Sequence, residues 1–443
     1  MTGVTHSQPA DRAGRSLTAD ADHEAETIMV QVKHVERPSP AVRRDTTAGF
    51  ARMGWLPGIE ALRGIAAAMV VVHHSWSLST QPHFPGYEIV EGFGSLGVNL
   101  FFLLSGFLLA DQFWRPKEQR SVRSFWIRRF FRIAPAYYVT IGVLFLFYAE
   151  HSLLFSEQGV QQILANATFM QYLFPSTSSS LNVDGALWTL TAEFLLYLTL
   201  PLMALPFLRW PRLSFVLLVG IGVGWRLWIA LGGDGLRELY FGPIGSGPDP
   251  GIQSLFLSRQ FLGIVPIFAL GIGLKYLVTR GLLDRGRRYL PQYFSVPLVV
   301  LSFVPALLML LFVERASDFH HWIWFTGFDY VVALLLIPVL LVAAQPGNPS
   351  PGLLGRGATW LGDRSYSLYI WHFPIILSVY GRGPLVNPPD VAHIWAKLAL
   401  IAVLALTAAH ISYVALEKPG IAFGRKVAAR YAKRQAPMSG VAQ

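Results

Sequence analysis

Residues 62–75 read LRGIAAAMVVVHHS, an apolar run of Ala, Val, Ile and Met that contains one arginine and two histidines. A helix that crosses the hydrocarbon core of a bilayer needs about 20 mostly apolar residues. The surrounding segment, 57–78, has this length and contains only Glu60 and Arg63 as carboxylate or guanidinium groups. The stretch therefore predicts a membrane-spanning helix that carries polar groups inside it.

The composition extends this prediction to most of the chain. Of 443 residues, 53% are hydrophobic and 14% are charged, whereas soluble globular domains have about 25% charged residues. The mean hydropathy is +0.43. We therefore expect an all-α polytopic membrane protein with about ten transmembrane helices. The expected spans are 57–78, 96–112, 133–149, 187–208, 213–231, 260–279, 294–313, 328–344, 366–381 and 392–416.

The basic residues indicate the orientation of these spans. Most Lys and Arg residues fall in the flanks and connections on one side, and the connections on the other side hold four: Arg237, Arg259, Arg315 and Arg382. By the positive-inside rule, both termini are predicted to be cytoplasmic. The net charge of +10 is explained by this asymmetry, and no nucleic-acid partner is expected.

Three regions follow from these patterns. Residues 1–54 lack an apolar stretch and predict a disordered cytoplasmic tail. Residues 55–418 form the predicted transmembrane domain, and residues 419–443 form a basic cytoplasmic tail. The chain has no cysteine, which excludes disulfides and thiolate metal sites, and no HExxH pattern occurs. We therefore expect no metal.

Helical geometry selects one of the two histidines in the opening stretch. At about 100° per residue, Arg63 and His74 lie within about 20° of each other and about 16 Å apart along the axis. Glu60 falls on the same face, whereas His73 lies about 80° away. Ionisable groups inside a membrane usually face a bundle interior or a wet cavity. Glu60, Arg63 and His74 are therefore predicted to line a functional face.

Several stretches of the chain resemble the acyltransferase 3 family of integral membrane acyltransferases. In that family an arginine, ten residues and a histidine occur in the first helix, a spacing that Arg63 and His74 match and His73 does not. The matching stretches are GIEALRGIAAAMVVVHHS (58–75), GVNLFFLLSGFLLADQF (97–113), RSFWIRRFFRIAPAYY (123–138), ALWTLTAEFLLYL (186–198), LGDRSYSLYIWHFPI (361–375) and EKP (417–419).

The resemblance implies transfer of an acyl group, commonly acetyl from acetyl-CoA or another acyl-CoA, to a hydroxyl that is often on a sugar. The expected acceptor is an exported or lipid-linked glycan, and the expected location is the bacterial cytoplasmic (inner) membrane. Two alternatives stay open: acylation of a glycosylated natural product such as a macrolide, and a membrane transporter or flippase, for which buried charges are equally natural.

The chemistry assigns roles to individual residues. A sugar hydroxyl needs a base to take its proton, which favours His74 as the general base. Arg63 is predicted to contact the donor or to organise the electrostatics of the same face. Glu193, a carboxylate inside a membrane run, is predicted to pair with Arg63, to orient His74, or to hold Arg226.

The remaining site residues are predicted to serve either the donor or the acceptor. The cytoplasmic connection is expected to bind the anionic donor, with Arg128 and Arg132 sharing a helix face. Ser105 is expected to serve the donor site through helix packing. The full donor set is Arg128, Arg129, Arg132 and Ser105, and the residues expected near the acceptor are Glu60, Trp188 and His372.

Overall fold

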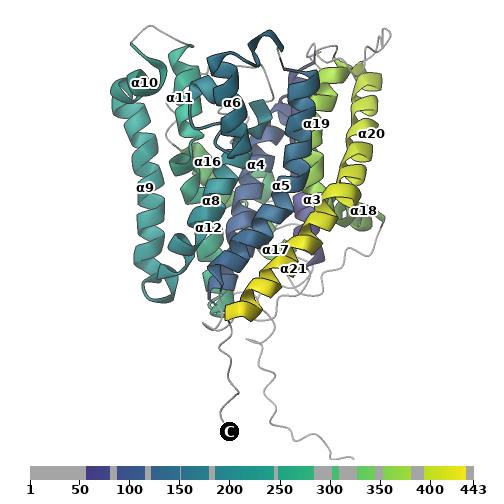
Figure 1. Cartoon of the computed structure of the whole chain (residues 1–443). Coiled ribbons are helices and arrows are strands. Elements are labelled where there is room, and N and C mark those ends of the chain that lie inside the picture. Colours follow the sequence, from purple (N-terminus) through teal and green to yellow (C-terminus); the bar gives the residue numbers. More distant parts are fainter. Residues whose placement is uncertain are drawn as a thin grey trace, which may run out of the picture. The chain divides into compact units, whose positions relative to one another are not determined.

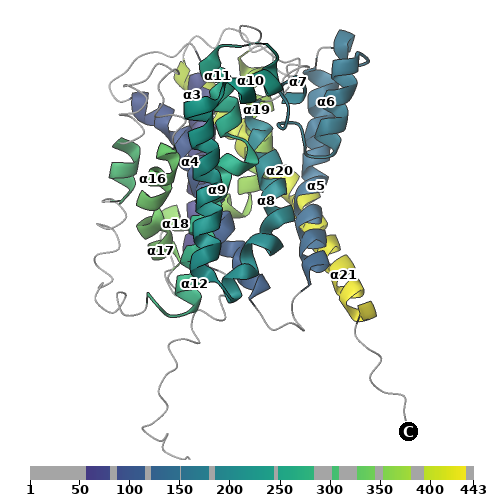
Figure 2. The ribbon, with the colours of Figure 1, turned by 90° about the vertical axis from the view of Figure 1, so that its left-hand side faces the viewer.

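The structure is a computed structural model in which helices are the only regular elements of the described residues. It describes residues 56–79, 87–114, 121–149, 151–178, 185–243, 248–283, 302–308, 327–344, 353–380 and 394–435. The long helices run alongside one another in both views (Figures 1 and 2). The predicted tail over 1–54 lies outside the described residues.

The helices follow one another with short 3-10 turns between some of them. Their order is α3 (Pro57–Ser77), α4 (Tyr87–Leu109), η1 (Ala110–Phe113), α5 (Val122–Phe147), η3 (His151–Leu153), α6 (Glu157–Ala167), α7 (Pro175–Ser178), η4 (Gly185–Leu187), α8 (Trp188–Ala204), η5 (Pro206–Leu208), α9 (Pro211–Gly232), α10 (Asp234–Phe241), α11 (Pro250–Ser258), α12 (Phe261–Thr279), α16 (Phe328–Leu335), α17 (Ile337–Ala343), α18 (Leu353–Asp363), α19 (Ser365–Val379), α20 (Ile394–Ser412), the π-helical turn η7 (Tyr413–Glu417) and α21 (Lys418–Gln435).

Glycines allow the central helices to pack closely. A Cβ at Gly106 of α4 would overlap the carbonyl of Phe268 on α12, and a Cβ at Gly362 of α18 would overlap the carbonyl of Glu60 on α3. Small residues at such crossings let helix backbones approach each other inside a membrane. Helix α3 therefore packs between α4, α18 and α19, which places its polar residues inside the protein.

Six helices of the described part are long and apolar enough to cross a membrane. They are Ile89–Phe113, Val122–Phe147, Trp188–Leu208, Pro211–Gly232, Phe261–Thr279 and Ile394–Ala432. Helix α3 is less apolar than these six because its polar residues lower its hydropathy. The expected total of ten spans therefore stays a prediction, whereas the polytopic helical architecture is confirmed.

Several predicted boundaries were wrong. The second and third spans begin earlier than expected, at Tyr87 and Val122. The span expected over 328–344 divides at Leu336 into α16 and α17, where a proline stands at the start of α17. Most of the span expected over 294–313 lies outside the described residues. The predicted tail from 419 is helical as far as Gln435, because α21 continues from η7 and packs against α5.

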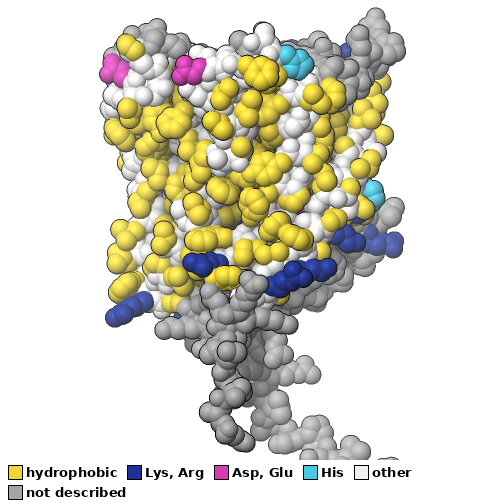
Figure 3. Space-filling view, viewed as in Figure 1, with side chains coloured by type: hydrophobic (Ala, Val, Ile, Leu, Met, Phe, Trp, Pro, Cys, Tyr) yellow, Lys and Arg dark blue, Asp and Glu magenta, His cyan; other side chains and the backbone are white. Residues whose placement is uncertain are grey.

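Apolar side chains cover the side of the bundle that Figure 3 shows. Lys and Arg side chains gather along its lower edge, and acidic side chains lie near its upper edge (Figure 3). Helix α9 illustrates the apolar band, since Val216 is 63% exposed and Leu231 is 84% exposed. Exposed apolar surface of this kind suits contact with lipid.

Candidate active site

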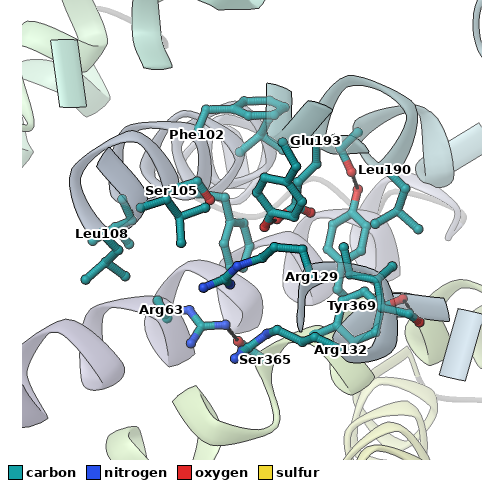
Figure 4. A pocket seen from close by; sticks show the side chains of 18 of the residues that line it. Arg63, Phe102, Ser105, Leu108, Arg129, Arg132, Leu190, Glu193, Ser365 and Tyr369 are labelled. Atoms are coloured by element: carbon teal, nitrogen blue, oxygen red, sulfur yellow. Dashed lines mark hydrogen bonds between the residues drawn. The ribbon is translucent and has the colours of Figure 1, made fainter. Parts of the chain in front are cut away.

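Two cavities lie among the central helices. We call the first the arginine chamber; its volume is about 290 Å³, and helices α3, α4, α5, α8 and α19 line it. Figure 4 shows the side chains of Arg63, Arg129 and Arg132 close together in it. The charged and serine residues of its lining are Glu60, Arg63, Ser105, Arg129, Arg132, Glu193 and Ser365.

Arg63 is fixed by two partners in the arginine chamber. Its Nη1 donates to Glu60 Oε2 at 2.9 Å, and its Nη2 donates to Ser365 Oγ at 3.1 Å. Ser365 is completely buried at the start of α19. The predicted proximity of Glu60 and Arg63 is confirmed, and Ser365 is a partner that the sequence did not reveal.

Arg129 and Arg132 are three residues apart on α5, so they face the same side of the helix. Arg132 Nη2 lies 3.8 Å from Glu417 Oε1. The Arg129 guanidinium lies over the rings of Phe125 and Tyr197, at 5.8 and 5.7 Å from their centroids. Arg129 forms no ion pair with a carboxylate in the described ranges. Its charge is therefore available to an anionic ligand.

Arg128, which was predicted to belong to the donor site, lies outside the arginine chamber. Arg128 is exposed and does not line the chamber, and its Nη2 lies 3.4 Å from Gln112 Oε1. Arg129 and Arg132, which were also predicted for the donor site, do line the chamber. Ser105 lines the same chamber.

Glu193 lies in the arginine chamber and accepts a hydrogen bond from the Tyr197 hydroxyl. One predicted partner, Arg226, is instead bound to Asp329 at 3.1 Å. Its predicted part in orienting His74 stays a prediction: Glu193 lines the arginine chamber and not the cavity that His74 lines. Glu193 thus lies in the same chamber as Arg63, Arg129 and Arg132.

The second cavity, which we call the histidine chamber, has a volume of about 150 Å³. It lies toward the other end of α3 and α4, where α3 ends and α4 begins. Its polar lining includes His73, His74, Ser95, Arg226, Arg259 and Asp329, and Trp188 lies among them. The predicted face of α3 is therefore divided: Glu60 and Arg63 line one chamber and His74 lines the other.

A chain of hydrogen bonds defines the protonation of His74. The Nδ1 of His372 contacts the carbonyl oxygen of Tyr369, which can only accept, so His372 Nδ1 carries a hydrogen. In neutral His372, Nε2 is then the acceptor, and it lies 2.9 Å from His74 Nδ1. His74 Nδ1 must donate this bond. The Nε2 of His74 is left with a free lone pair, as a general base requires.

His372 contacts His74 and does not line either cavity. It is completely buried, and its ring stacks against His74 with centroids 5.1 Å apart. The prediction that His372 lies near the acceptor is not tested by this arrangement, in which His372 is a hydrogen-bond partner of His74.

The prediction that His73 points away from the site was wrong. Its ring lines the histidine chamber beside His74, with ring centroids 5.1 Å apart. A Cβ at Gly94 would lie 2.5 Å from the His73 ring, so His73 packs against α4 at that glycine. The angular offset of about 80° separates the two side chains without removing either from the cavity.

A thin partition separates the two chambers. Val98, Phe102 and Tyr369 line both of them. The Tyr369 hydroxyl is held by Thr189 Oγ1 and the Ala186 carbonyl, each at 2.6 Å. A molecule that reached from one chamber into the other would pass these three side chains.

Sequence reasoning missed residues whose role depends on tertiary contacts. Ser365, Tyr369 and Glu417 lay in stretches that were matched as a whole, without a signal for the single residue. Arg259 was counted only as a basic residue of an outer connection. No cluster of three or more His, Asp or Glu side chains suited to a metal occurs in the part of the chain that the structure describes.

Comparison with known proteins identifies the family. The family model described as an acyltransferase domain matches residues 56–414. The chain is 25% identical over 82% of its length to the peptidoglycan O-acetyltransferase OatA of Listeria monocytogenes, and 28% identical over 82% of its length to the O-acetyltransferase OatA of Staphylococcus aureus. It spans 56% and 57% of these relatives. No solved structure matches. The chain belongs to the acyltransferase 3 family.

Proposed function

We propose that this protein is an O-acyltransferase of the bacterial cytoplasmic membrane that moves an acetyl group from acetyl-CoA to a sugar hydroxyl of an exported or lipid-linked glycan. The family match supports acyl transfer. The relatives named as peptidoglycan and other O-acetyltransferases support acetyl as the group and a glycan as the acceptor.

The observation that carries this proposal is the hydrogen-bonded chain from Tyr369 through His372 to His74. It leaves a lone pair on Nε2 of His74, a residue that lines the histidine chamber. A positioned base of this kind accelerates proton transfer by about 10²–10⁴-fold. His372 resembles the orienting member of a catalytic triad, because it fixes the tautomer of the base without touching the substrate.

The arginine chamber suits the donor. Coenzyme A carries several phosphate charges, and guanidinium groups bind phosphate through paired N–H donors. Arg63, Arg129 and Arg132 supply three such groups in one cavity. The basic lower edge of the bundle (Figure 3) supports a cytoplasmic orientation for that end, where acyl-CoA is made.

The reaction then proceeds in the histidine chamber. His74 Nε2 takes the proton from the acceptor hydroxyl while the hydroxyl oxygen forms a bond to the thioester carbonyl carbon. The carbon–sulfur bond breaks, the new ester forms, and the departing sulfur receives the proton from His74. The thioester end of the donor reaches His74 by passing Val98, Phe102 and Tyr369.

The test is acyl transfer by the purified full chain in lipid nanodiscs. Acetyl-CoA labelled in the acetyl group is incubated with a soluble glycan fragment, and labelled ester is measured by mass spectrometry. His74→Ala should lose at least about 10²-fold in rate. His151→Ala changes an exposed histidine outside both chambers and should leave the rate unchanged.

Three outcomes would overturn the proposal. One is a His74→Ala protein that transfers acetyl at the wild-type rate. Another is transfer only to glycosylated macrolides, which would favour the natural-product alternative. Movement of glycan across vesicles without ester formation would favour a transporter or flippase.

A further inference from the structure

The histidine chamber contains a cation, Arg259, that the proposed proton transfer does not use. Arg259 directly follows α11, and its guanidinium carbon lies 5.0 Å from the centroid of the Trp188 ring. Both side chains line the chamber together with His74. The location of Arg259 beside the proposed base raises the question of what this charge binds.

The charges of the chamber do not balance within its lining. Asp329 is the carboxylate of that lining, and it is engaged by Arg226 at 3.1 Å. Arg259 makes no ion pair with any carboxylate of the described ranges. The lining thus holds two guanidinium groups against one carboxylate. A charged group removed from water is costly unless it is paired, so an anionic ligand would stabilise the chamber.

Trp188 gives Arg259 a defined position. A guanidinium over an indole ring is attracted by about 0.5–2 kcal/mol. Arg259 also shares a hydrogen bond with the Tyr172 side chain, and a guanidinium has five N–H donors, so further donors remain at the edge of its plane. This planar fork matches the paired oxygens of a carboxylate or phosphate. Trp188 itself is held among aromatic rings, with centroids 5.9 Å from Tyr172 and 6.3 Å from Phe102.

The volume limits what the chamber admits. At about 150 Å³ it is smaller than the roughly 300–1,000 Å³ of typical ligand pockets. A cavity of this size suits one ring-sized group at the end of a larger acceptor. The anion that Arg259 binds would therefore belong to the same sugar residue that is acylated, or to the group attached directly to it.

We propose that the histidine chamber binds an anionic acceptor, a sugar that carries a carboxylate or phosphate group, and that Arg259 is the residue that binds this anion. The inference rests on the proposed function in taking the acceptor to meet His74 in this chamber. It adds the charge class of the acceptor and names Arg259 as a specificity-determining residue.

The first experiment measures the charge preference of the chamber without any acyl transfer. The chain has no cysteine, so Ser95→Cys introduces a single thiol in the lining of the chamber. Its rates of modification by anionic sulfonatoethyl and cationic trimethylammonioethyl methanethiosulfonate are compared. We expect the ratio of anionic to cationic rates to fall by about tenfold when Arg259→Gln is added. Arg259→Lys should retain most of the ratio because it retains the charge.

Arg237→Gln is the matched control. Arg237 belongs to the same group of outer arginines, but it is bound to Asp234 at 2.7 Å and does not line the chamber. Its replacement should leave the ratio unchanged. An unchanged ratio in Arg259→Gln, or an equal fall in Arg237→Gln, would overturn the inference.

The second experiment compares acceptors in the nanodisc assay. Methyl glucoside is the neutral acceptor, methyl glucuronide carries a carboxylate, and glucose 1-phosphate carries a phosphate. The wild-type protein should show a lower KM for one of the two anionic sugars than for methyl glucoside. The anionic sugar with the lower KM shows whether the bound anion is a carboxylate or a phosphate. Arg259→Gln should raise that KM by about 10- to 100-fold, as expected for loss of a charged hydrogen bond, and leave the KM of methyl glucoside unchanged.

The two experiments separate this inference from the proposed function. If the thiol shows anion preference but no acceptor is acylated, the proposed function fails and the anion site stands. If acyl transfer occurs with the lowest KM for methyl glucoside, or if Arg259→Gln raises all three values equally, the proposed function stands and the anion site fails.

Discussion

Replacing His372 by phenylalanine would keep a buried ring of similar size but remove the nitrogen that accepts the hydrogen bond of His74. That bond is 2.9 Å long, and His372 is completely buried, so water cannot substitute for the missing acceptor. A buried donor left without its partner costs about 1–3 kcal/mol. His74 can avoid this cost only by adopting the other tautomer, in which Nε2 carries the proton and cannot act as a base. A penalty of this size corresponds to a loss of about 5- to 150-fold in kcat.

The assay is steady-state acyl transfer with purified variants in nanodiscs. His372→Phe should lower kcat by this factor and leave the KM for acetyl-CoA unchanged, because the proposed function has the donor's phosphates bound in the arginine chamber, away from His372. His372→Gln provides the conservative variant, since its side-chain oxygen can accept from His74 Nδ1, and it should recover much of the lost kcat. If the two variants lose kcat equally while both remain folded, His372 acts through packing and the relay is wrong. A His372→Phe protein with normal kcat would refute it directly.

Three further results are expected. Arg129→Gln should raise the KM for acetyl-CoA by about 10- to 100-fold, whereas the same change at exposed Arg128 should have little effect; equal effects would contradict the assignment of the donor chamber. Phe102→Ala should open the partition and raise the rate with butyryl-CoA relative to acetyl-CoA by about tenfold, and an unchanged ratio would show that Phe102 does not limit the acyl group. In the cysteine-free chain, Gln158→Cys should react with a membrane-impermeant maleimide on intact cells and Lys426→Cys only after permeabilisation; the reverse pattern would invert the proposed orientation.

The helical membrane architecture was readable from the sequence because it depends on local composition. Long apolar runs have to form helices in lipid, where each backbone group needs an internal hydrogen bond. Helix ends were less predictable. Helix α5 begins eleven residues before the apolar run it contains, since a cap at Ser121 and helix-forming polar residues extend it. Hydropathy alone does not detect such extensions.

The site was predictable in part. The spacing of Arg63 and His74 placed both residues on one face of α3, and both do line cavities. Their separation into two chambers could not be predicted, because it depends on Phe102 and Tyr369 from other helices. The partner of His74 was also hidden: His372 lies 298 residues away along the chain, and only the fold brings the two rings together.

The arrangement of the two chambers has a consequence for how a membrane enzyme of this type handles its substrates. Acyl-CoA is too highly charged to cross a bilayer, and the three arginines would hold its phosphates at the basic end of the bundle. The proposed base lies at the other end of α3, beyond a partition of three side chains. Only the neutral, flexible arm that carries the thioester has to pass Phe102. The acyl group would then reach an acceptor on the opposite face while the charged donor never leaves its own side, and the tight packing around the partition would keep ions from following it.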